Sequence, residues 1–334
     1  MSRSLADLAE RGPHPVGLLT LELPDPEDLE RTRPTDVWYP AAHLDDAAGS
    51  PPDHPFGQPH RARLGLPATQ GPHPLVAFSH GNSGLSRQST FLTTHLASWG
   101  MVVAGPDHSG NTFFEMLPVK ERDDVVRVHL NARRNRPRDI DTVIETLLAS
   151  RVGWPEVDPE RVGILGHSYG GWTALKMPAL NPRVGAVCGL APASEPFVGR
   201  KAFEAGELPF ARSIPTLLVA GVDDVLVDLE TSVRPLFERL TEPRALVSVE
   251  GADHFHFCDG TPLLHGFHEH NPRDNPPRPT RPYADLLPED RMHRLLRALV
   301  THFFRAAFEG RADACSALSS PALRDLDPSL HRLA

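Results

Sequence analysis

From residue 75 onward, short apolar runs alternate with longer segments whose apolar residues recur at helical spacing. The apolar runs are residues 75–79, 101–105, 162–165, 184–190, 216–220 and 245–249. The helical segments are residues 88–99, 139–149, 170–179, 233–240 and 290–308. Strand signals that alternate with helix signals predict an α/β fold with a mostly parallel, doubly wound sheet. Because the runs are continuously apolar, we expect helices to cover both faces of this sheet.

The two ends of the chain differ from this central part. Residues 16–23 and 35–39 read as two strands joined by a Pro/Asp-rich turn, which predicts an antiparallel pair. Residues 41–74 are rich in Pro, Gly, His and Ala and predict a long irregular surface segment. The weakly patterned residues 311–334 predict a loosely held tail. We therefore expect one domain over residues 1–334, with an N-terminal part (1–74), a catalytic core (75–310) and a C-terminal tail (311–334).

The sequence GHSYG at residues 166–170 lies between a predicted strand and a predicted helix. A G-x-S-x-G pattern in this context predicts a tight turn that strains the serine backbone and raises its hydroxyl above the sheet edge. The flanking glycines lack the Cβ atoms that would collide where strand and helix cross. We predict that Ser168 is a nucleophile; the alternative is a Gly-rich turn with an idle serine.

A serine hydroxyl needs a neighbouring base, and the base needs an orienting carboxylate. In this type of fold the partners follow in the order Ser, Asp, His, after later strands. Asp223 and Asp224 follow the strand 216–220, and either could be the acid. His254 follows the strand 245–249 and is the leading base, with His256 as the alternative.

An oxyanion hole needs two backbone N–H groups directed at the developing negative charge. One should come from Tyr169, directly after the nucleophile. The other should come from the HGNSG turn at residues 80–84, which follows the strand 75–79, and we assign it to Asn82. The alternative for this turn is a plain glycine loop.

Composition narrows the functional classes. The chain has 334 residues, of which 40% are hydrophobic, enough for one large domain or two small ones. A net charge of −9 without a basic stripe argues against a nucleic-acid partner. Three distant cysteines do not suggest a disulfide framework. No secretory leader is evident at residues 1–10, and the uncharged stretch 88–106 is too polar for a membrane span, so we expect a cytoplasmic protein.

Histidines cluster late in the chain, in residues 265–270 and upstream at His254 and His256, next to Cys258. A zinc site would need four converging ligands in tightly spaced pairs. The spacing here is irregular and the sequence that follows is Pro-rich, so solvent-facing loop histidines are favoured. We therefore predict no metal site.

Two aromatic segments are candidates for the substrate pocket. Residues 111–135 contain Phe113, Phe114, Met116 and Leu117, and would either line an acyl pocket, form a small lid or pack on the body as a helix. Residues 192–212, with three phenylalanines, are the second candidate wall. Neither segment indicates the length of the acyl group, and the oligomeric state is not predicted.

Several motifs together resemble one branch of the α/β-hydrolase superfamily. They are GPHPVG at 12–17, VWYP at 37–40, FSHG at 78–81, RPRDI at 136–140, GHSYGG at 166–171 and GADHF at 251–255. The branch holds plasma-type platelet-activating-factor acetylhydrolase and bacterial predicted dienelactone-hydrolase-like proteins, with bacterial cutinase-like polyester hydrolases as more distant kin. The resemblance covers roughly residues 12–308. It implies a serine hydrolase of carboxylic esters without metal or organic cofactor, acting on a small or lipid-like ester.

The resemblance also bears on single residues. It favours Asp224 over Asp223, because members usually carry the acid three residues after the glycine that ends the strand. Dienelactone hydrolases use a cysteine nucleophile where this chain has Ser168. Members often carry an acidic-basic-acidic cluster after the strand 101–105, where this chain has PDHSG at 106–110. We expect Asp107 and His108 near the rim of the site in a structural role.

Two other functions use the same residues differently. The chain could transfer acyl groups or cleave amides with the same nucleophile, or it could be an inactive hydrolase scaffold that binds a ligand. The presence of a complete predicted set of nucleophile, base, acid and oxyanion donors argues against the inactive scaffold.

Overall fold

The predicted apolar runs become neighbouring strands of a ten-stranded sheet. The computed structural model describes residues 4–25, 28, 31–42, 61–149, 151–199, 201–270, 276–311, 313–318 and 320–333. Within these residues the strand order is β10-β9-β8-β7-β6-β4-β5-β2-β1-β3. The strands are β1 (Val16–Pro24), β2 (Thr32–Pro40), β3 (Arg63–Leu64), β4 (His73–Ser79), β5 (Val102–Pro106), β6 (Val157–His167), β7 (Val184–Leu190), β8 (Thr216–Gly221), β9 (Arg244–Val249) and β10 (Leu330–Leu333).

Strands β4 to β9 run parallel to one another, and β1 and β2 form the predicted antiparallel pair. The central strands β5 and β8 are buried along their whole length, as continuous apolar runs predict. The α/β-hydrolase fold expected from the sequence is therefore confirmed. Because the parallel strands end at one edge of the sheet, the loops that follow them meet there.

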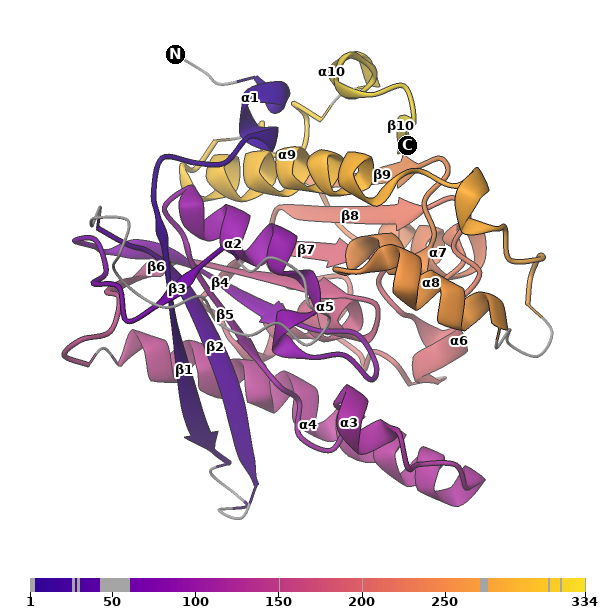
Figure 1. Ribbon diagram of the computed structural model, residues 1–334, viewed down its shortest axis with the longest axis horizontal. Helices are drawn as coiled ribbons and strands as arrows, with labels where there is room; N and C mark the ends of the chain where they lie inside the picture. Colours follow the sequence, from indigo (N-terminus) through magenta and orange to yellow (C-terminus); the bar gives the residue numbers. More distant parts are fainter. Residues whose placement is uncertain are drawn as a thin grey trace.

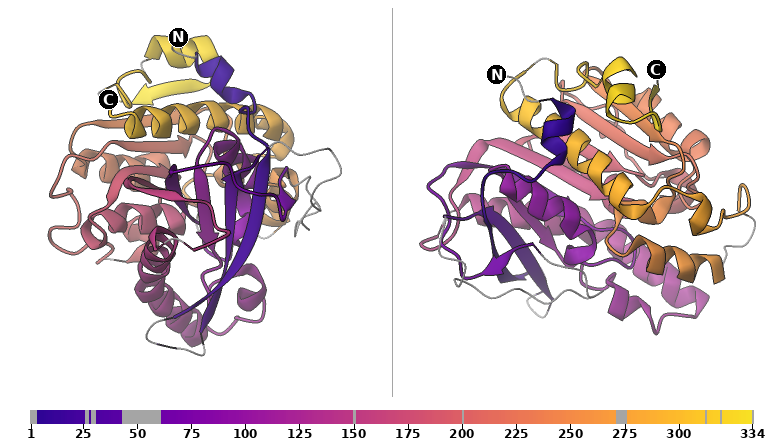
Figure 2. Two further views of the ribbon diagram at one scale, coloured as in Figure 1. Left: turned by 90° about the vertical axis from the view of Figure 1, so that its left-hand side faces the viewer. Right: turned by 45° about the horizontal axis from the view of Figure 1, so that its top comes forward.

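Helices cover both faces of the sheet (Figures 1 and 2). The helices are α1 (Leu5–Ala9), α2 (Thr90–Ser98), α3 (Phe113–Met116), α4 (Arg122–Leu148), α5 (Tyr169–Leu180), α6 (Glu195–Val198), α7 (Arg234–Arg239), α8 (Thr261–His270), α9 (Glu289–Phe308) and α10 (Ser320–Leu326). Helices α4 and α5 pack on one face, and α2 and α9 pack on the other, with α1 lying on α9. Phe303 and Phe304 of α9 are fully buried against the sheet, as the predicted apolar stripe of this helix requires.

Helix α4 is longer than the sequence predicted. It begins at Arg122 and continues through Pro137, whereas the sequence predicted a helix only from residue 139. Its first turns carry exposed apolar residues such as Val126 and Leu130, so they present no apolar stripe that would reveal a helix. A proline inside the pattern also suggests a boundary. The structure places the aromatic segment 111–135 in α3 and the first half of α4.

The predicted loose tail is in fact part of the sheet. Strand β10 pairs antiparallel with β9, with Leu330 opposite Val249, and forms the sheet edge. Leu318, Leu323 and Leu330 are fully buried. Four residues are too short for a periodic signal, and the pairing partner lies about 80 residues away, so sequence pattern alone did not reveal the strand.

Two other expectations concern surface segments and membranes. Most of the irregular segment 41–74, namely residues 43–60, lies outside the described residues, and β3 adds to β1 after it. Among the helices that the structure describes, none combines the length and apolar character of a membrane span.

Candidate active site

Ser168 occupies a strained turn between β6 and α5. Its backbone has φ +56° and ψ −116°, in the left-handed half of conformational space that non-glycine residues seldom adopt. The turn is held on both sides, because the Ser168 N–H donates to the Leu190 carbonyl at 2.9 Å and its carbonyl accepts from Ala193 N–H at 2.9 Å. Such a conformation costs of order 1–3 kcal/mol and persists only where surrounding structure enforces it.

The glycines of the turn are needed for close packing, as the sequence predicted. A Cβ at Gly166 would lie 2.0 Å from the Gly170 carbonyl oxygen. A Cβ at Gly170 would lie 1.9 Å from the carbonyl oxygen of Ser79, at the end of β4. Both distances are far shorter than any real carbon–oxygen contact. The turn therefore brings the start of α5 directly against the end of a neighbouring strand.

Asp224 and His254 meet across the loops that follow β8 and β9. His254 Nδ1 lies 2.7 Å from Asp224 Oδ2. The other carboxylate oxygen of Asp224 accepts the N–H groups of Leu226 and Val227, both at 2.8 Å. Since an ionised carboxylate only accepts, Nδ1 of His254 carries the proton and Nε2 is left as an acceptor.

The alternative acid and base have other partners. Asp223 accepts the Gly251 N–H at 3.0 Å and pairs with Arg281 at 3.1 Å, so it braces the loop that carries the histidine. His256 is fully buried and contacts Asp253 at 2.6 Å and the Leu287 carbonyl at 2.8 Å. The geometry therefore brings together Asp224 and His254, and not Asp223 or His256.

Ser168 and His254 line the same pocket, which has a volume of about 220 Å³. Gly81, Asn82, Ser83, Gly84 and Leu85 form one side of it. The rest is mainly apolar and comes from several elements: Phe113, Phe197, Leu226, Val227, Phe255, Cys258 and Leu264, together with the polar Gln88 and His167. Each aromatic segment predicted as a wall thus supplies one phenylalanine. Phe114 is instead 62% exposed, and Phe210 is buried away from the pocket.

The two predicted oxyanion donors lie beside Ser168. A Cβ at Gly81 would be 3.5 Å from the Ser168 Cβ, so the turn at residues 80–84 touches the nucleophile. Tyr169 is the first residue of α5, where N–H groups lack an intrahelical acceptor and carry the positive end of the helix dipole. Gln88, which the sequence did not single out, accepts the Gly81 N–H at 3.0 Å. Asn82 follows Gly81 in the pocket wall.

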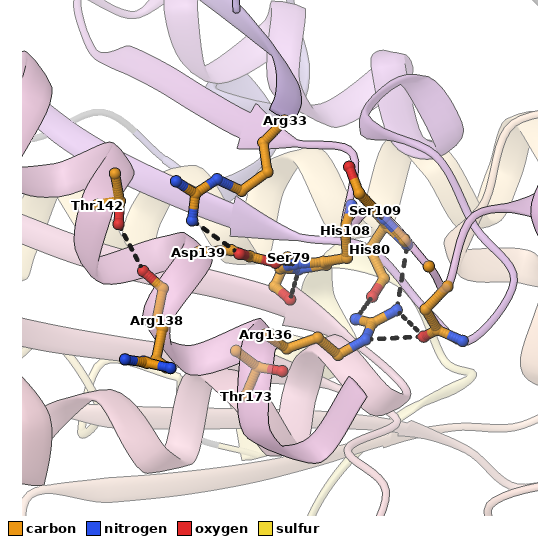
Figure 3. Close-up of polar contacts among 12 residues, drawn as sticks. Arg33, Ser79, His80, His108, Ser109, Arg136, Arg138, Asp139, Thr142 and Thr173 are labelled. Atoms are coloured by element: carbon orange, nitrogen blue, oxygen red, sulfur yellow. Dashed lines mark hydrogen bonds and ion pairs between the residues drawn. The ribbon is translucent and has the colours of Figure 1, made fainter. Parts of the chain in front are cut away.

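A connected Ser-His-Asp series of Ser79, His108 and Asp139 lies outside the pocket lining (Figure 3). Ser79 Oγ is 2.8 Å from His108 Nε2, and His108 Nδ1 is 2.9 Å from Asp139 Oδ2. Arg33 contacts Asp139 Oδ1 at 2.9 Å, and Arg31 contacts both Asp139 oxygens. All three members of the series are at most 1% exposed, and none of them lines the pocket.

The expectation that His108 lies at the rim is therefore wrong. Burial, reinforced by the charge of Arg136, lowers the pKa of His108 to about 4, so the imidazole stays neutral at physiological pH. A fully enclosed series with a neutral imidazole and a carboxylate paired with arginines fits a structural role. The sequence gives no signal for it because its members come from three separate segments.

Two of the late histidines, His256 and His265, contact Asp253, the residue before His254. Both are fully buried, so the expectation of solvent-facing loop histidines is wrong for them. His265 Nδ1 contacts one Asp253 oxygen, and His265 Nε2 lies 2.9 Å from the Arg281 carbonyl. Both partners are acceptors, so both nitrogens donate and His265 is an imidazolium. Burial lowers the pKa of His265, but the hydrogen bond and charge of Asp253 outweigh it and leave the pKa raised. Among the described residues, no group of His, Cys, Asp and Glu is arranged to hold a metal ion.

Comparisons with known proteins identify the relatives of this chain. A family model described as PET hydrolase-like matches residues 68–267, which is more than half of the chain. Cutinase 1 of Thermobifida cellulosilytica is 24% identical over 191 residues, covering 57% of this chain and 63% of the cutinase. Cutinase est2 of Thermobifida alba is 22% identical over 193 residues, covering 57% of this chain and 55% of the relative. The chain thus spans between 55% and 63% of the length of these relatives.

A solved structure shows the same fold over the whole chain. A ferulic acid esterase from Streptomyces cinnamoneus superposes with a TM-score of 0.68 at 23% sequence identity, covering 100% of both chains. At this identity the likeness establishes the fold.

The charged His265 predicts a pH dependence of stability. A raised pKa contributes stability fully below the ordinary histidine value of about 6.5, and this contribution is lost as pH rises through the folded-state pKa. We expect His265→Asn to lower the free energy of unfolding at pH 6 by about 1.5–3 kcal/mol. The difference from the wild type should shrink between pH 6.5 and 8.5 in urea titrations.

The control is His270→Asn, because the His270 side chain is exposed and its Nδ1 contacts the Gly266 carbonyl of its own helix at 2.7 Å. It should leave both the stability and its pH profile within about 0.5 kcal/mol of the wild type. A stability difference for His265→Asn that stays constant across this pH range would contradict an imidazolium at this position.

Proposed function

We propose that this chain, which belongs to the PET hydrolase-like family, hydrolyses carboxylic esters through an acyl-enzyme intermediate on Ser168. The observation that carries the proposal is the 2.7 Å contact between Asp224 and His254, in a pocket that Ser168 also lines. The α/β-hydrolase fold and the cutinase relatives support the same reaction. The roles of the individual residues below are part of this proposal.

In the first half of the reaction, Ser168 Oγ attacks the ester carbonyl while His254 Nε2 takes the hydroxyl proton. Asp224 keeps Nδ1 protonated and stabilises the imidazolium that forms. The two N–H groups on the other Asp224 oxygen hold the carboxylate in place, so the imidazole keeps its orientation. The proton then passes from Nε2 to the leaving alkoxide, and the acyl group stays on Ser168.

The negative charge of the tetrahedral intermediate falls on the former carbonyl oxygen. We assign its stabilisation to the backbone N–H groups of Tyr169 and Asn82, each of which is worth on the order of 3 kcal/mol in the barrier. In the second half, water replaces the alcohol, His254 accepts its proton, and the same donors stabilise the second tetrahedral intermediate. The acid leaves and Ser168 regains its proton.

The pocket indicates what kind of ester fits. About 220 Å³ is below the range of about 300–1,000 Å³ typical of sites that enclose a drug-sized ligand. We infer that the pocket takes one acyl or aromatic group next to the scissile bond, with the rest of the substrate outside. Exposed apolar residues lie close in sequence to two residues of the pocket wall. They are Phe114 and Leu117, which follow Phe113, and Leu263 and Phe267, which lie near Leu264. They favour water-insoluble esters, including polyesters of the kind that the family description names.

We also propose a closer kinship with plasma-type platelet-activating-factor acetylhydrolase and dienelactone-hydrolase-like proteins. The N-terminal motifs that carry this resemblance are packing motifs. A Cβ at Gly12 would lie 2.2 Å from the Ser98 carbonyl oxygen, and a Cβ at Gly17 would lie 2.2 Å from the Tyr39 ring. This kinship would extend the substrates to short-acyl phospholipids, which a substrate panel should include.

Ester hydrolysis is tested with p-nitrophenyl acetate. The wild type should release a burst of p-nitrophenol close to one equivalent per chain, or turn over steadily if deacylation is fast. Ser168→Ala should lose the burst and at least about 10⁴-fold in kcat, because the nucleophile is missing.

Ser79→Ala is the matched control, since it removes the serine of the other Ser-His-Asp series. It should keep the capacity to form one acyl-enzyme per chain, measured by quenching and intact mass. An active Ser168→Ala protein, or a Ser79→Ala protein that no longer acylates while folded, would contradict the assignment.

The pocket assignment predicts that Phe113 and its neighbour Phe114 have different effects. Phe113→Ala should raise KM for p-nitrophenyl hexanoate and p-nitrophenyl benzoate by about 10-fold or more, since apolar contact in a pocket is worth about 1–3 kcal/mol. Phe114→Ala should leave KM for these soluble esters within about two-fold and weaken adsorption to a polyester film. Equal effects of the two substitutions on KM would rule out the proposed pocket wall.

A further inference from the structure

Arg136, in the RPRDI motif of α4, binds the turn that carries a proposed oxyanion donor. Its side chain is fully buried although it carries a charge. Nη1 donates to the His80 carbonyl at 2.6 Å, and Nη2 donates to the Gly81 carbonyl at 2.7 Å. Nε and Nη2 both donate to Asn111 Oδ1, at 2.9 and 2.7 Å. One guanidinium therefore fixes two successive peptide groups of the turn (Figure 3).

The contact with the Gly81 carbonyl determines the direction of the next N–H. The Gly81 C=O and the Asn82 N–H belong to one planar peptide group, and in a trans peptide they point in opposite directions. Because Arg136 holds the carbonyl from the side of α4, the Asn82 N–H is turned away from α4. Asn82 also lines the pocket that contains Ser168.

His80 supplies a second donor to the same carbonyl. Its Nε2 accepts the His108 N–H at 3.0 Å, so the proton of the neutral ring is on Nδ1. Nδ1 lies 2.7 Å from the Gly81 oxygen. Burial, with the charge of Arg136 as the next cause, holds the pKa of His80 well below its ordinary value, which keeps this tautomer neutral. The His108 backbone N–H thus fixes the tautomer of His80, and His80 supports the turn.

Asn111 links Arg136 to the Asn82 side chain as well. Its Oδ1 accepts from Arg136, and its Nδ2 donates to Asn82 Oδ1 at 3.0 Å. The Asn82 residue is therefore held at its side chain by Asn111 and at its preceding carbonyl by Arg136. Both proposed oxyanion donors also adjoin the same cation, because the Arg136 guanidinium lies 4.7 Å from the centre of the Tyr169 ring.

Burying Arg136 among these partners is energetically unfavourable for folding. Its acceptors are two backbone carbonyls and an amide oxygen, all neutral. Burial lowers the pKa of Arg136 to about 10, so the side chain still carries its charge at neutral pH. Burying a charge without a carboxylate partner is unfavourable unless its hydrogen bonds are satisfied, and such departures are typical of functional sites.

We propose that Arg136 is a positioning residue for the oxyanion hole. It holds the Gly81–Asn82 peptide so that the Asn82 N–H faces the substrate oxygen. This inference rests on the proposed ester hydrolase function. Lysine at this position keeps the charge but offers a single ammonium in place of the planar fork, so it cannot fix both carbonyls and Asn111 in the same geometry. The effect should appear in the transition state and in its analogues, and not in binding of the ground state.

The experiment compares the wild type with Arg136→Lys, using p-nitrophenyl acetate and phenylboronic acid, which forms a tetrahedral adduct with a reactive serine. All rates are expressed per site titrated with a fluorophosphonate, so that misfolded protein does not count. We expect kcat to fall by about 10- to 1,000-fold and the Kd of phenylboronic acid to rise by a similar factor. KM should stay within about three-fold of the wild type.

Arg138→Lys is the matched control, because Arg138 belongs to the same motif and its side chain extends away from His80 (Figure 3). It should leave kcat and the Kd of phenylboronic acid within about two-fold of the wild type. Asn111→Ala is the second variant, and it tests the positioning role if Arg136→Lys does not fold. It removes the link to the Asn82 side chain and should weaken phenylboronic acid binding by about 3- to 30-fold at unchanged KM.

The outcomes separate this inference from the function on which it rests. Folded Arg136→Lys and Asn111→Ala proteins whose kcat and boronate affinity per titrated site match the wild type would overturn the positioning role, even if their melting temperatures fall. A wild-type protein that neither hydrolyses the ester nor takes the fluorophosphonate would overturn the function itself, and with it the role of Arg136.

Discussion

The close crossing of β6 and α5 at Ser168 is the constraint on which the rest of the site depends. The nucleophile keeps a left-handed backbone because Gly166 and Gly170 allow main-chain atoms to approach where any side chain would collide. The same crossing presses Gly170 against the Ser79 carbonyl. The turn at residues 80–84 begins at the next residue, so the packing that strains the serine also brings the proposed oxyanion loop beside it.

The protein holds two sets of Ser, His and Asp, and their surroundings differ. In the set proposed as catalytic, the Asp224 carboxylate is held by backbone N–H groups, and Ser168 and His254 both line a pocket. In the series of Ser79, the carboxylate of Asp139 is held by arginines and every member is enclosed. Sequence order or spacing alone would not distinguish the serine that lines a pocket from the enclosed serine. The exposure of each serine and the groups that bind each carboxylate distinguish the two sets.

Much of this arrangement could be predicted from the sequence, for local reasons. Short apolar runs located the parallel strands, and the loops after parallel strands must meet at one edge, which placed Ser168, Asp224 and His254 in the same region. The catalytic roles of these residues stay predictions, as do the division into regions, the cytoplasmic location and the absence of a nucleic-acid partner. The first half of α4 and the strand β10 were missed because the former lacks an apolar stripe and the latter is short.

The contacts of Arg136 with residues 80, 81 and 111 could not be predicted from the sequence. They join segments that are far apart in the chain, and no sequence pattern indicates that these segments meet. The RPRDI motif was visible in the sequence, but its meaning depended on where α4 carries it. Long-range polar contacts of this kind are specified by the complete fold and not by any periodic pattern. They connect the chemistry expected of a hydrolase fold to side chains outside the pocket lining.

The central claim is that Ser168 is the reactive group of this protein. Its most direct test is to incubate the protein with a fluorophosphonate and to locate the adduct by peptide mass spectrometry. The account predicts one adduct per chain, on Ser168, formed much more slowly when His254 is replaced by alanine. An adduct on Ser79 or on any other residue, or no adduct on a folded protein, would contradict it.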